Sequence, residues 1–227
     1  MKEDQASYFE SNDFLDLLTC YENMVEDGAS HYFDGIDISN IAEFYSSMND
    51  DDKAMEAIRF GLSLHPKDTD ILITEGQVLL RQGRSVESRA IAESIDDDNN
   101  RELLFLKGSI ELFDGNPGLA DEYFHLSVEA DEHGPGLYAD IIAIFTDYAQ
   151  YDFAQTWLNE ALALEPESKD FIEQQADLYF ATQDYGNATK TYNLLIDDYP
   201  YDTYYWEQLI CIAYRQENWA QALDYFG

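Results

Sequence analysis

The side chains that could bind a metal ion or transfer a proton are scattered through this chain rather than grouped. Apart from scattered Asp and Glu neighbours, no histidine has a metal-ligating partner three or four residues away, on the same helical face; the histidines are His31, His65, His125 and His133. The acidic runs 50–52 and 96–98 lack the alternating ligands, central glycine and terminal glutamate of an EF-hand loop. No phosphate-binding loop, dinucleotide-binding glycine motif, serine nucleophile motif or zinc-protease motif is present. The sequence therefore predicts no metal, no cofactor and no catalytic residue, and we expect a non-enzymatic protein.

The charge of the chain limits its partners. Its 227 residues include 47 Asp and Glu but only 12 Lys and Arg, a formal net charge of -35. Such a surface repels nucleic-acid phosphates and anionic lipid headgroups, so we expect neither a nucleic acid nor a membrane as partner. A positively charged protein or peptide is favoured instead. Composition alone leaves open whether the acidity serves recognition, solubility or adaptation to salt.

No stretch of the chain resembles a signal peptide or a membrane-spanning helix. The first residues, MKEDQASYFE, have no cationic segment followed by an apolar run, and no segment approaches the roughly 18 to 20 apolar residues that a membrane span needs. These features predict a cytoplasmic protein. Cys20 and Cys211 lie at opposite ends of the chain, and we expect both to be small buried hydrophobic residues rather than a disulfide.

A helical pattern with a period of 34 residues organises most of the chain. The same interval separates four alanines, Ala120, Ala154, Ala188 and Ala222. A large apolar or aromatic residue follows each of them by four positions, on the same helical face: Phe124, Leu158, Tyr192 and Phe226. Prolines stand twelve residues after three of the repeat alanines, where a helix must end: Pro66, Pro166 and Pro200. Each period therefore predicts two helices of about 14 residues joined by a short polar turn.

These positions resemble the tetratricopeptide repeat family. The resemblance covers residues 35 to 227: small residues on the first helix (Gly76, Gly108, Ala176), alanine on the second (Ala54, Ala120, Ala154, Ala188, Ala222) and the closing prolines. Trp206 and Leu209 match the family's tryptophan and leucine, while Ser88 departs from its alanine. The resemblance implies an all-α, right-handed superhelical solenoid of helix pairs.

The frame divides the chain into a lead-in and about six repeats. The lead-in, residues 1–34, is predicted to be a capping helix with one apolar stripe. The repeats are predicted at 35–68, 69–100, 101–134, 135–168, 169–202 and an incomplete 203–227. Because the last helix stops at Gly227, short of the usual length, we expect that the natural protein continues. An uncapped final repeat also predicts possible self-association.

The family resemblance also implies where a partner would bind. In tetratricopeptide repeats the first helices line a concave groove through the second, fifth, ninth and twelfth frame positions. At these positions the chain has no Lys or Arg, so it is not expected to clamp a peptide's terminal carboxylate. The candidate groove residues are instead acidic, polar and aromatic: Glu43, Asp70, Gln77, Glu102, Phe105, Ser109, Glu173, Asp177, Phe180, Tyr204, Glu207 and Tyr214.

This combination predicts a scaffold that binds a protein or peptide segment. Carboxylates steer and pair with Lys or Arg, and aromatic rings supply contact area and cation–π faces, so the segment is expected to be basic or mixed basic and apolar. Two alternatives stay open: a chaperone-like holdase or assembly factor for basic proteins, and an enzyme or sugar-binding protein built on helical repeats.

Overall fold

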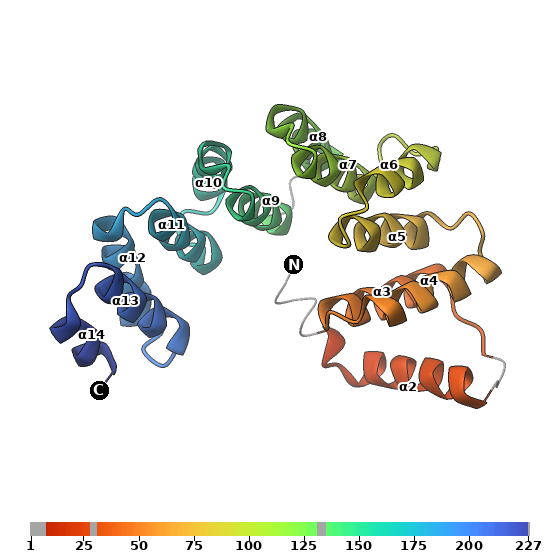
Figure 1. Ribbon diagram of the computed structural model, residues 1–227, viewed down its shortest axis with the longest axis horizontal. Coiled ribbons are helices and arrows are strands. Elements are labelled where there is room, and N and C mark those ends of the chain that lie inside the picture. Colours follow the sequence, from red (N-terminus) through yellow and green to blue (C-terminus); the bar gives the residue numbers. More distant parts are fainter. Residues whose placement is uncertain (1–7, 28–30, 131–134, 227) are drawn as a thin grey trace. The chain divides into compact units, whose positions relative to one another are not determined.

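All regular secondary structure in the described part of the chain is helical. The computed structural model describes residues 8–27, 31–130 and 135–226 (Figure 1). The chain forms two compact units, Met1–His133 and Gly134–Gly227. The N-terminal unit contains α2 (Asn12–Asp27), α3 (Gly35–Ser47), α4 (Asp51–Leu64), α5 (Thr69–Arg81), α6 (Ser85–Ser94), α7 (Arg101–Phe113) and α8 (Pro117–Ala130). The C-terminal unit contains α9 (Pro135–Asp147), α10 (Tyr151–Leu164), α11 (Lys169–Ala181), α12 (Tyr185–Asp198), α13 (Thr203–Arg215) and α14 (Trp219–Phe226).

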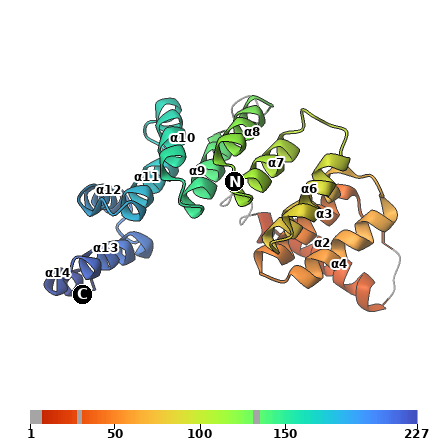
Figure 2. The same cartoon turned by 45° about the horizontal axis from the view of Figure 1, so that its top comes forward.

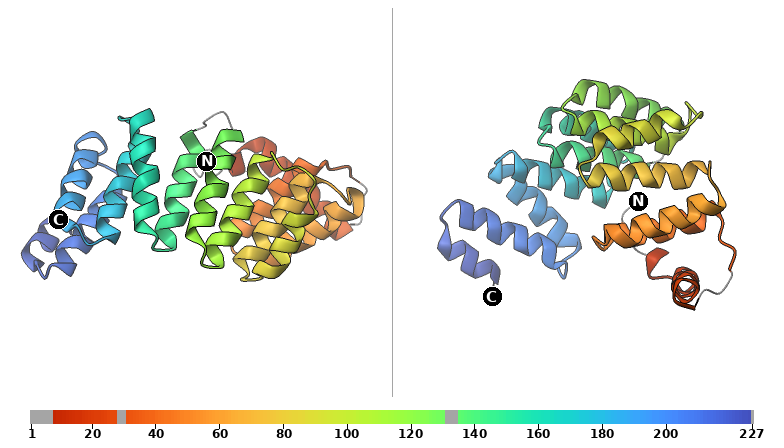
Figure 3. Two further views of the ribbon diagram at one scale, coloured as in Figure 1. Left: turned by 90° about the horizontal axis from the view of Figure 1, so that it is seen from above. Right: turned by 45° about the vertical axis from the view of Figure 1, so that its right-hand side comes forward.

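Consecutive helices pack against each other as pairs. The pairs are α3 with α4, α5 with α6, α7 with α8, α9 with α10, α11 with α12, and α13 with α14. Figure 2 shows α7 and α8 lying side by side, and the left view in Figure 3 shows the yellow and green helices of the N-terminal unit stacked next to one another. The prediction of an all-helical fold of sequential helix pairs is confirmed.

Small residues allow the two helices of a pair to approach. Ala54, Ala120, Ala154 and Ala188 have no solvent exposure. A methyl group added at Gly108 on α7 would lie 2.6 Å from Phe124 Cε1 on α8, the other helix of the pair. These positions are small because a larger side chain would overlap with the neighbouring helix.

One apolar core joins the first helix to the first pair. Helix α2 buries Phe14, Leu18 and Tyr21 in a cluster with residues of α3, α4 and α5. In the C-terminal unit, the core around Ala188 and Tyr192 combines residues of α11, α12 and α13. The cores of both units are therefore built by neighbouring helices along the sequence.

The same turn connects the two helices in all six pairs. Its left-handed residue is Asn49, Gly83, Gly115, Ala149, Gln183 or Glu217, with φ between 55° and 86°. In the first turn the amide of Asn49 donates to the carbonyl of Ser46, and that of Asp50 donates to Tyr45. This double hydrogen bond defines the Schellman motif, which ends a helix and satisfies its last carbonyl groups.

Several of the acidic residues are N-caps, at the residue before the first turn of a helix. Side-chain oxygens accept hydrogen bonds from first-turn amides at Asp34, Asp50, Asp68, Asp184 and Asp202. A carboxylate there satisfies free backbone donors and the positive end of the helix dipole. Part of the negative charge therefore stabilises the fold, whatever its role in recognition.

The prediction that both cysteines are buried is wrong for Cys211. Cys20 is half-buried against the N-terminal core, but Cys211 is exposed. Cys211 is the ninth residue of α13, and the buried residues of that helix are Tyr205, Leu209, Ile212 and Ala213. The apolar nature of a cysteine does not reveal which helical face it occupies.

Candidate functional site

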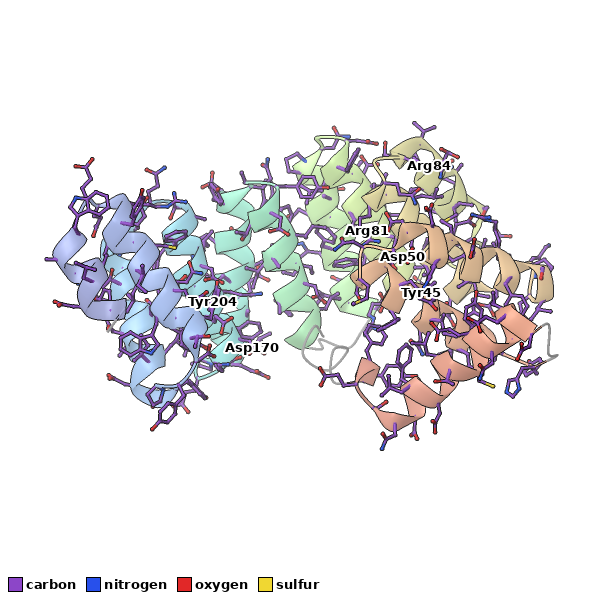
Figure 4. The ribbon with its side chains drawn as sticks, turned by 60° about the horizontal axis from the view of Figure 1, so that its bottom comes forward. Tyr45, Asp50, Arg81, Arg84, Asp170 and Tyr204 are labelled. Carbon is purple, nitrogen blue, oxygen red and sulfur yellow. The ribbon has the colours of Figure 1, made fainter. Side chains whose placement is uncertain are left out.

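Two carboxylates of α11 lie against tyrosines from neighbouring helices. Tyr192 and Tyr204 donate hydrogen bonds of 2.6 and 2.8 Å to the same oxygen of Asp177. One turn earlier, Glu173 accepts a 2.7 Å hydrogen bond from Tyr205. The structure thus brings together three of the predicted site residues, Glu173, Asp177 and Tyr204. Figure 4 shows Tyr204 on α13 and Asp170 at the start of α11.

Burial disfavours the charge on these carboxylates. Removal from water raises the pKa of Asp177, although the two tyrosine hydrogen bonds oppose this change. Burial also raises the pKa of Glu173, and the charge of Asp177 acts in the same direction. Burial and Asp177 together raise the pKa of Tyr192 and Tyr204, so both remain hydrogen-bond donors at neutral pH.

The aromatic residues of this candidate site differ in solvent exposure and in the side chains that contact them. Tyr204 is 37% exposed and Tyr214 is 63% exposed, with Trp219 edge-on to Tyr214 at 5.0 Å. Phe180 is half-buried, and the guanidinium of Arg215 lies 4.9 Å from its ring centroid. Glu207 is exposed on α13. The exposed rings offer contact area to a partner, whereas Arg215 already occupies one face of Phe180.

The predicted site residues of the N-terminal unit are less closely connected. Asp70 is exposed as a whole residue, but partial burial of its carboxyl group and the nearby charges of Asp68 and Glu102 raise its pKa. Glu102 also pairs with Arg101. Phe105 contacts the ring of Phe124 at 5.2 Å.

The other three predicted residues of this unit are mostly covered. Glu43 and Gln77 are half-buried. Ser109 is buried, and its hydroxyl donates to the carbonyl of Phe105. Ser109 therefore offers a partner little surface.

Known structures resemble the chain, although its sequence does not match known families. No family model matches the chain, and no curated protein is similar to it in sequence. A tetratricopeptide repeat protein from Parabacteroides merdae ATCC 43184 aligns with a TM-score of 0.57 at 16% identity, covering 83% of this chain and 75% of that one. A TPR protein of Thermus thermophilus aligns with a TM-score of 0.58 at 14% identity, covering 82% of this chain and 97% of the other. The chain has the tetratricopeptide repeat (TPR) fold.

A chain in a protein complex gives a match over more of this chain. A chain of the hetero-tetramer of the APC/C, Cut9–Hcn1, aligns with a TM-score of 0.63 at 14% identity, over 97% of this chain and 44% of that one. TPR folds typically serve as scaffolds for protein–protein interaction, since stacked repeats present extended binding surfaces.

The TPR frame positions did not reveal the basic residues beside the candidate site. Lys169 pairs with Asp202 at 3.8 Å and lies over the rings of Tyr199 and Tyr205. Arg215 lies over Phe180. Both occupy the ends of first helices, at frame positions one and thirteen, outside the four positions that the family resemblance indicates. A conspicuous signal was available: Lys and Arg are so rare in this chain that each one merits attention.

The displaced pKa values predict how the stability of this TPR chain depends on pH. Burial raises the carboxyl pKa of Asp37, Asp70, Glu75, Glu173 and Asp177. Hydrogen bonds from Arg84 and Arg89 lower the carboxyl pKa of Glu87 and Asp114. A carboxyl with a raised folded-state pKa binds protons more tightly when folded, so its stabilising effect is present at low pH and is lost as pH rises. We expect the melting temperature to increase as pH falls from 8 toward about 5, near the upper end of carboxyl titration.

The Asp177→Asn variant tests the source of this dependence. Asparagine keeps an oxygen for Tyr192 and Tyr204 but carries no charge, so the variant should melt higher than wild type at pH 8 and change less with pH. Thermal melts at several pH values, followed by circular dichroism, measure both slopes. A wild-type melting temperature that falls between pH 8 and 5 would contradict the prediction.

Proposed function

We propose that this chain is a non-enzymatic interaction scaffold that binds a basic, or mixed basic and apolar, protein segment on its α11–α13 surface. This surface consists of the predicted site residues of the C-terminal unit: Glu173, Asp177, Phe180, Tyr204, Glu207 and Tyr214. The observation that carries the proposal is the state of Asp177, whose carboxylate is held in a partly buried position by two tyrosines. In the described part of the chain, no Lys or Arg forms an ion pair with it.

An incoming cation would stabilise this arrangement. Burial of a charged carboxylate costs free energy, and a guanidinium or ammonium group beside it offsets part of that cost. Tyr204 provides exposed ring surface next to the charge, and Tyr214 adds an exposed ring elsewhere on α13, which suits the apolar stem of Lys or Arg and neighbouring apolar residues. The net charge of -35 would also accelerate association with a basic partner.

The two basic residues near this surface, Lys169 and Arg215, already have partners within the chain. Lys169 is paired with Asp202 and Arg215 stacks on Phe180, so both charges already have neighbours. Binding to a protein also agrees with the Cut9–Hcn1 complex, in which a chain of similar fold associates with other proteins.

Selection of peptides from a random library, followed by a charge-reversal variant, tests the proposal. Peptides that bind the wild-type chain should be enriched in Lys or Arg beside aromatic and aliphatic residues. Their affinity should fall about three- to tenfold in Glu207→Lys, and this loss should shrink at high salt. Glu207 is suitable because its side chain is exposed on α13.

Asp197→Lys is the matched control. Asp197 is exposed on α12 and is not one of the six residues that define the α11–α13 surface. The charge change is the same, so this variant should retain wild-type affinity. If both variants lose the same affinity, the loss results from the change in net charge and not from a contact at the proposed surface. Enrichment of acidic peptides would contradict the proposed partner chemistry.

A further inference from the structure

A small pocket in the N-terminal unit lies between α2 and the first helix pair. Its volume is about 200 Å³, and its walls come from α2, the end of α3 and the start of α4. Sites for cofactors and drug-sized ligands usually measure roughly 300–1,000 Å³. This pocket is therefore of a size that admits a single side chain rather than a larger molecule.

The walls of the pocket combine carboxylates with tyrosine rings. Glu22, Glu26 and Glu56 line it together with Tyr21 and Tyr45. Tyr45 donates a 3.0 Å hydrogen bond to Glu22, which fixes one carboxylate against one phenol. Glu26 and Glu56 are exposed, and no Lys or Arg among the described residues forms an ion pair with them.

The two phenols remain protonated in this setting. Burial and the charge of Glu56 raise the pKa of Tyr21 to about 12. Burial and the bond to Glu22 raise the pKa of Tyr45 further above its ordinary value. The rings are thus neutral and electron-rich, and the negative charge of the pocket resides on its carboxylates.

The protein already places a cation in this pocket. Lys53 lies with its ammonium nitrogen 5.0 Å from the centroid of the Tyr45 ring, within the range of a cation–π contact. Its contact with Asp50 is long, at 3.9 Å, and its side chain is 54% exposed. Figure 4 shows Tyr45 and Asp50 at the end where α3 turns into α4. An exposed and weakly held lysine can move aside for a ligand of the same charge.

We propose that this pocket binds the guanidinium group of an arginine side chain presented by a protein partner. A guanidinium is planar, so it stacks on a tyrosine ring while its edges donate to carboxylates on either side. A single metal ion fits less well, because in the described residues no three carboxylate, histidine or cysteine side chains are close enough to share one. The pocket contains none of the α11–α13 residues, so this inference does not rest on the proposed function.

Titration of the whole chain with N-acetyl-arginine amide, followed by NMR, tests the site. The methyl groups of Val25, which also lines the pocket, report binding directly. A ligand of about fifteen non-hydrogen atoms should bind with a dissociation constant on the order of 1 mM. N-acetyl-citrulline amide has nearly the same shape without the charge, and should bind at least about fivefold more weakly.

Variants locate the effect in the pocket. Glu26→Gln combined with Glu56→Gln should weaken arginine binding about fivefold or more, because two of the three pocket carboxylates lose their charge. Asp13→Asn combined with Asp16→Asn is the matched control, since it removes the same charge from exposed positions of α2 outside the pocket and should leave binding unchanged. Lys53→Ala should strengthen binding about threefold by removing the resident cation from the tyrosine ring.

Three results would overturn the inference. They are the absence of a saturable Val25 shift at tens of millimolar ligand, equal affinity for the citrulline analogue, and unchanged affinity in the double glutamine variant with a native circular dichroism spectrum. The citrulline comparison uses the wild-type chain and therefore holds even if a variant folds poorly. Shifts confined to the C-terminal unit would contradict this site while leaving the α11–α13 proposal intact.

Discussion

The Ala188→Asp variant should lose on the order of 4 kcal/mol of unfolding free energy, a large part of the total for a domain of this kind. Ala188 lies on α12 with no solvent exposure, inside the core cluster that contains Ala176, Tyr192 and Leu209. A carboxylate there would be buried without a cation, and it would also need space that the packed helices do not leave. Urea unfolding, monitored by circular dichroism, measures the loss.

Asn193→Asp provides the matched control for this substitution. It adds the same negative charge to the same helix at an exposed position, so we expect a change of only a few tenths of a kcal/mol. If Ala188→Asp has the same urea midpoint of unfolding as the wild-type chain, the packing assigned to α12 is incorrect. If both variants are equally destabilised, general charge repulsion rather than burial is responsible.

The Arg89→Ala variant should lose about 2–3 kcal/mol, because it leaves a buried carboxylate without its cation. Arg89 on α6 donates to Glu111 on α7 at 2.5 Å and to Asp114 at 2.8 Å. The side chain of Glu111 is only 8% exposed, and its other oxygen accepts a 3.0 Å hydrogen bond from Asn116. Because Arg89 itself is 36% exposed, water will offset part of the loss.

A second substitution separates charge from packing in this pair. Glu111→Gln in the Arg89→Ala background removes the unpaired charge and should recover more than half of the lost stability. Arg84→Ala, which breaks the exposed contact with Glu87, should leave the melting temperature almost unchanged. If Arg89→Ala is as stable as wild type, the buried pair makes no net contribution.

Local rules made the helices predictable from the sequence. The 34-residue spacing of small and large apolar residues determines which face of each helix is buried, and Ala120 and Phe124 are indeed without solvent exposure. The departure at Ser88 also has a local explanation: its buried hydroxyl donates a 2.7 Å hydrogen bond to the carbonyl of Gly76. A serine therefore replaces alanine there without leaving a polar group unsatisfied.

The contacts within the candidate site were not predictable in the same way. Tyr204 and Asp177 are 27 residues apart, and Arg215 reaches Phe180 from another helix. Periodicity assigns residues to a face, but it does not determine the rotamer of a long side chain or its partner on the next helix. For this reason the sequence indicated Phe180 as an open aromatic face, whereas a guanidinium covers it.

The turn within each helix pair accepts different residue types at its left-handed position. Glycine is the residue best suited to the left-handed position, yet only Gly83 and Gly115 use it, and the other four turns carry Asn49, Ala149, Gln183 and Glu217. A non-glycine residue there costs about 1 kcal/mol, which the packing of two helices easily exceeds. The flanking helices thus impose the backbone geometry, and the turn position does not require glycine. Turns that differ in sequence while the helix pairs stay intact agree with a fold that structural comparison detects and family models do not.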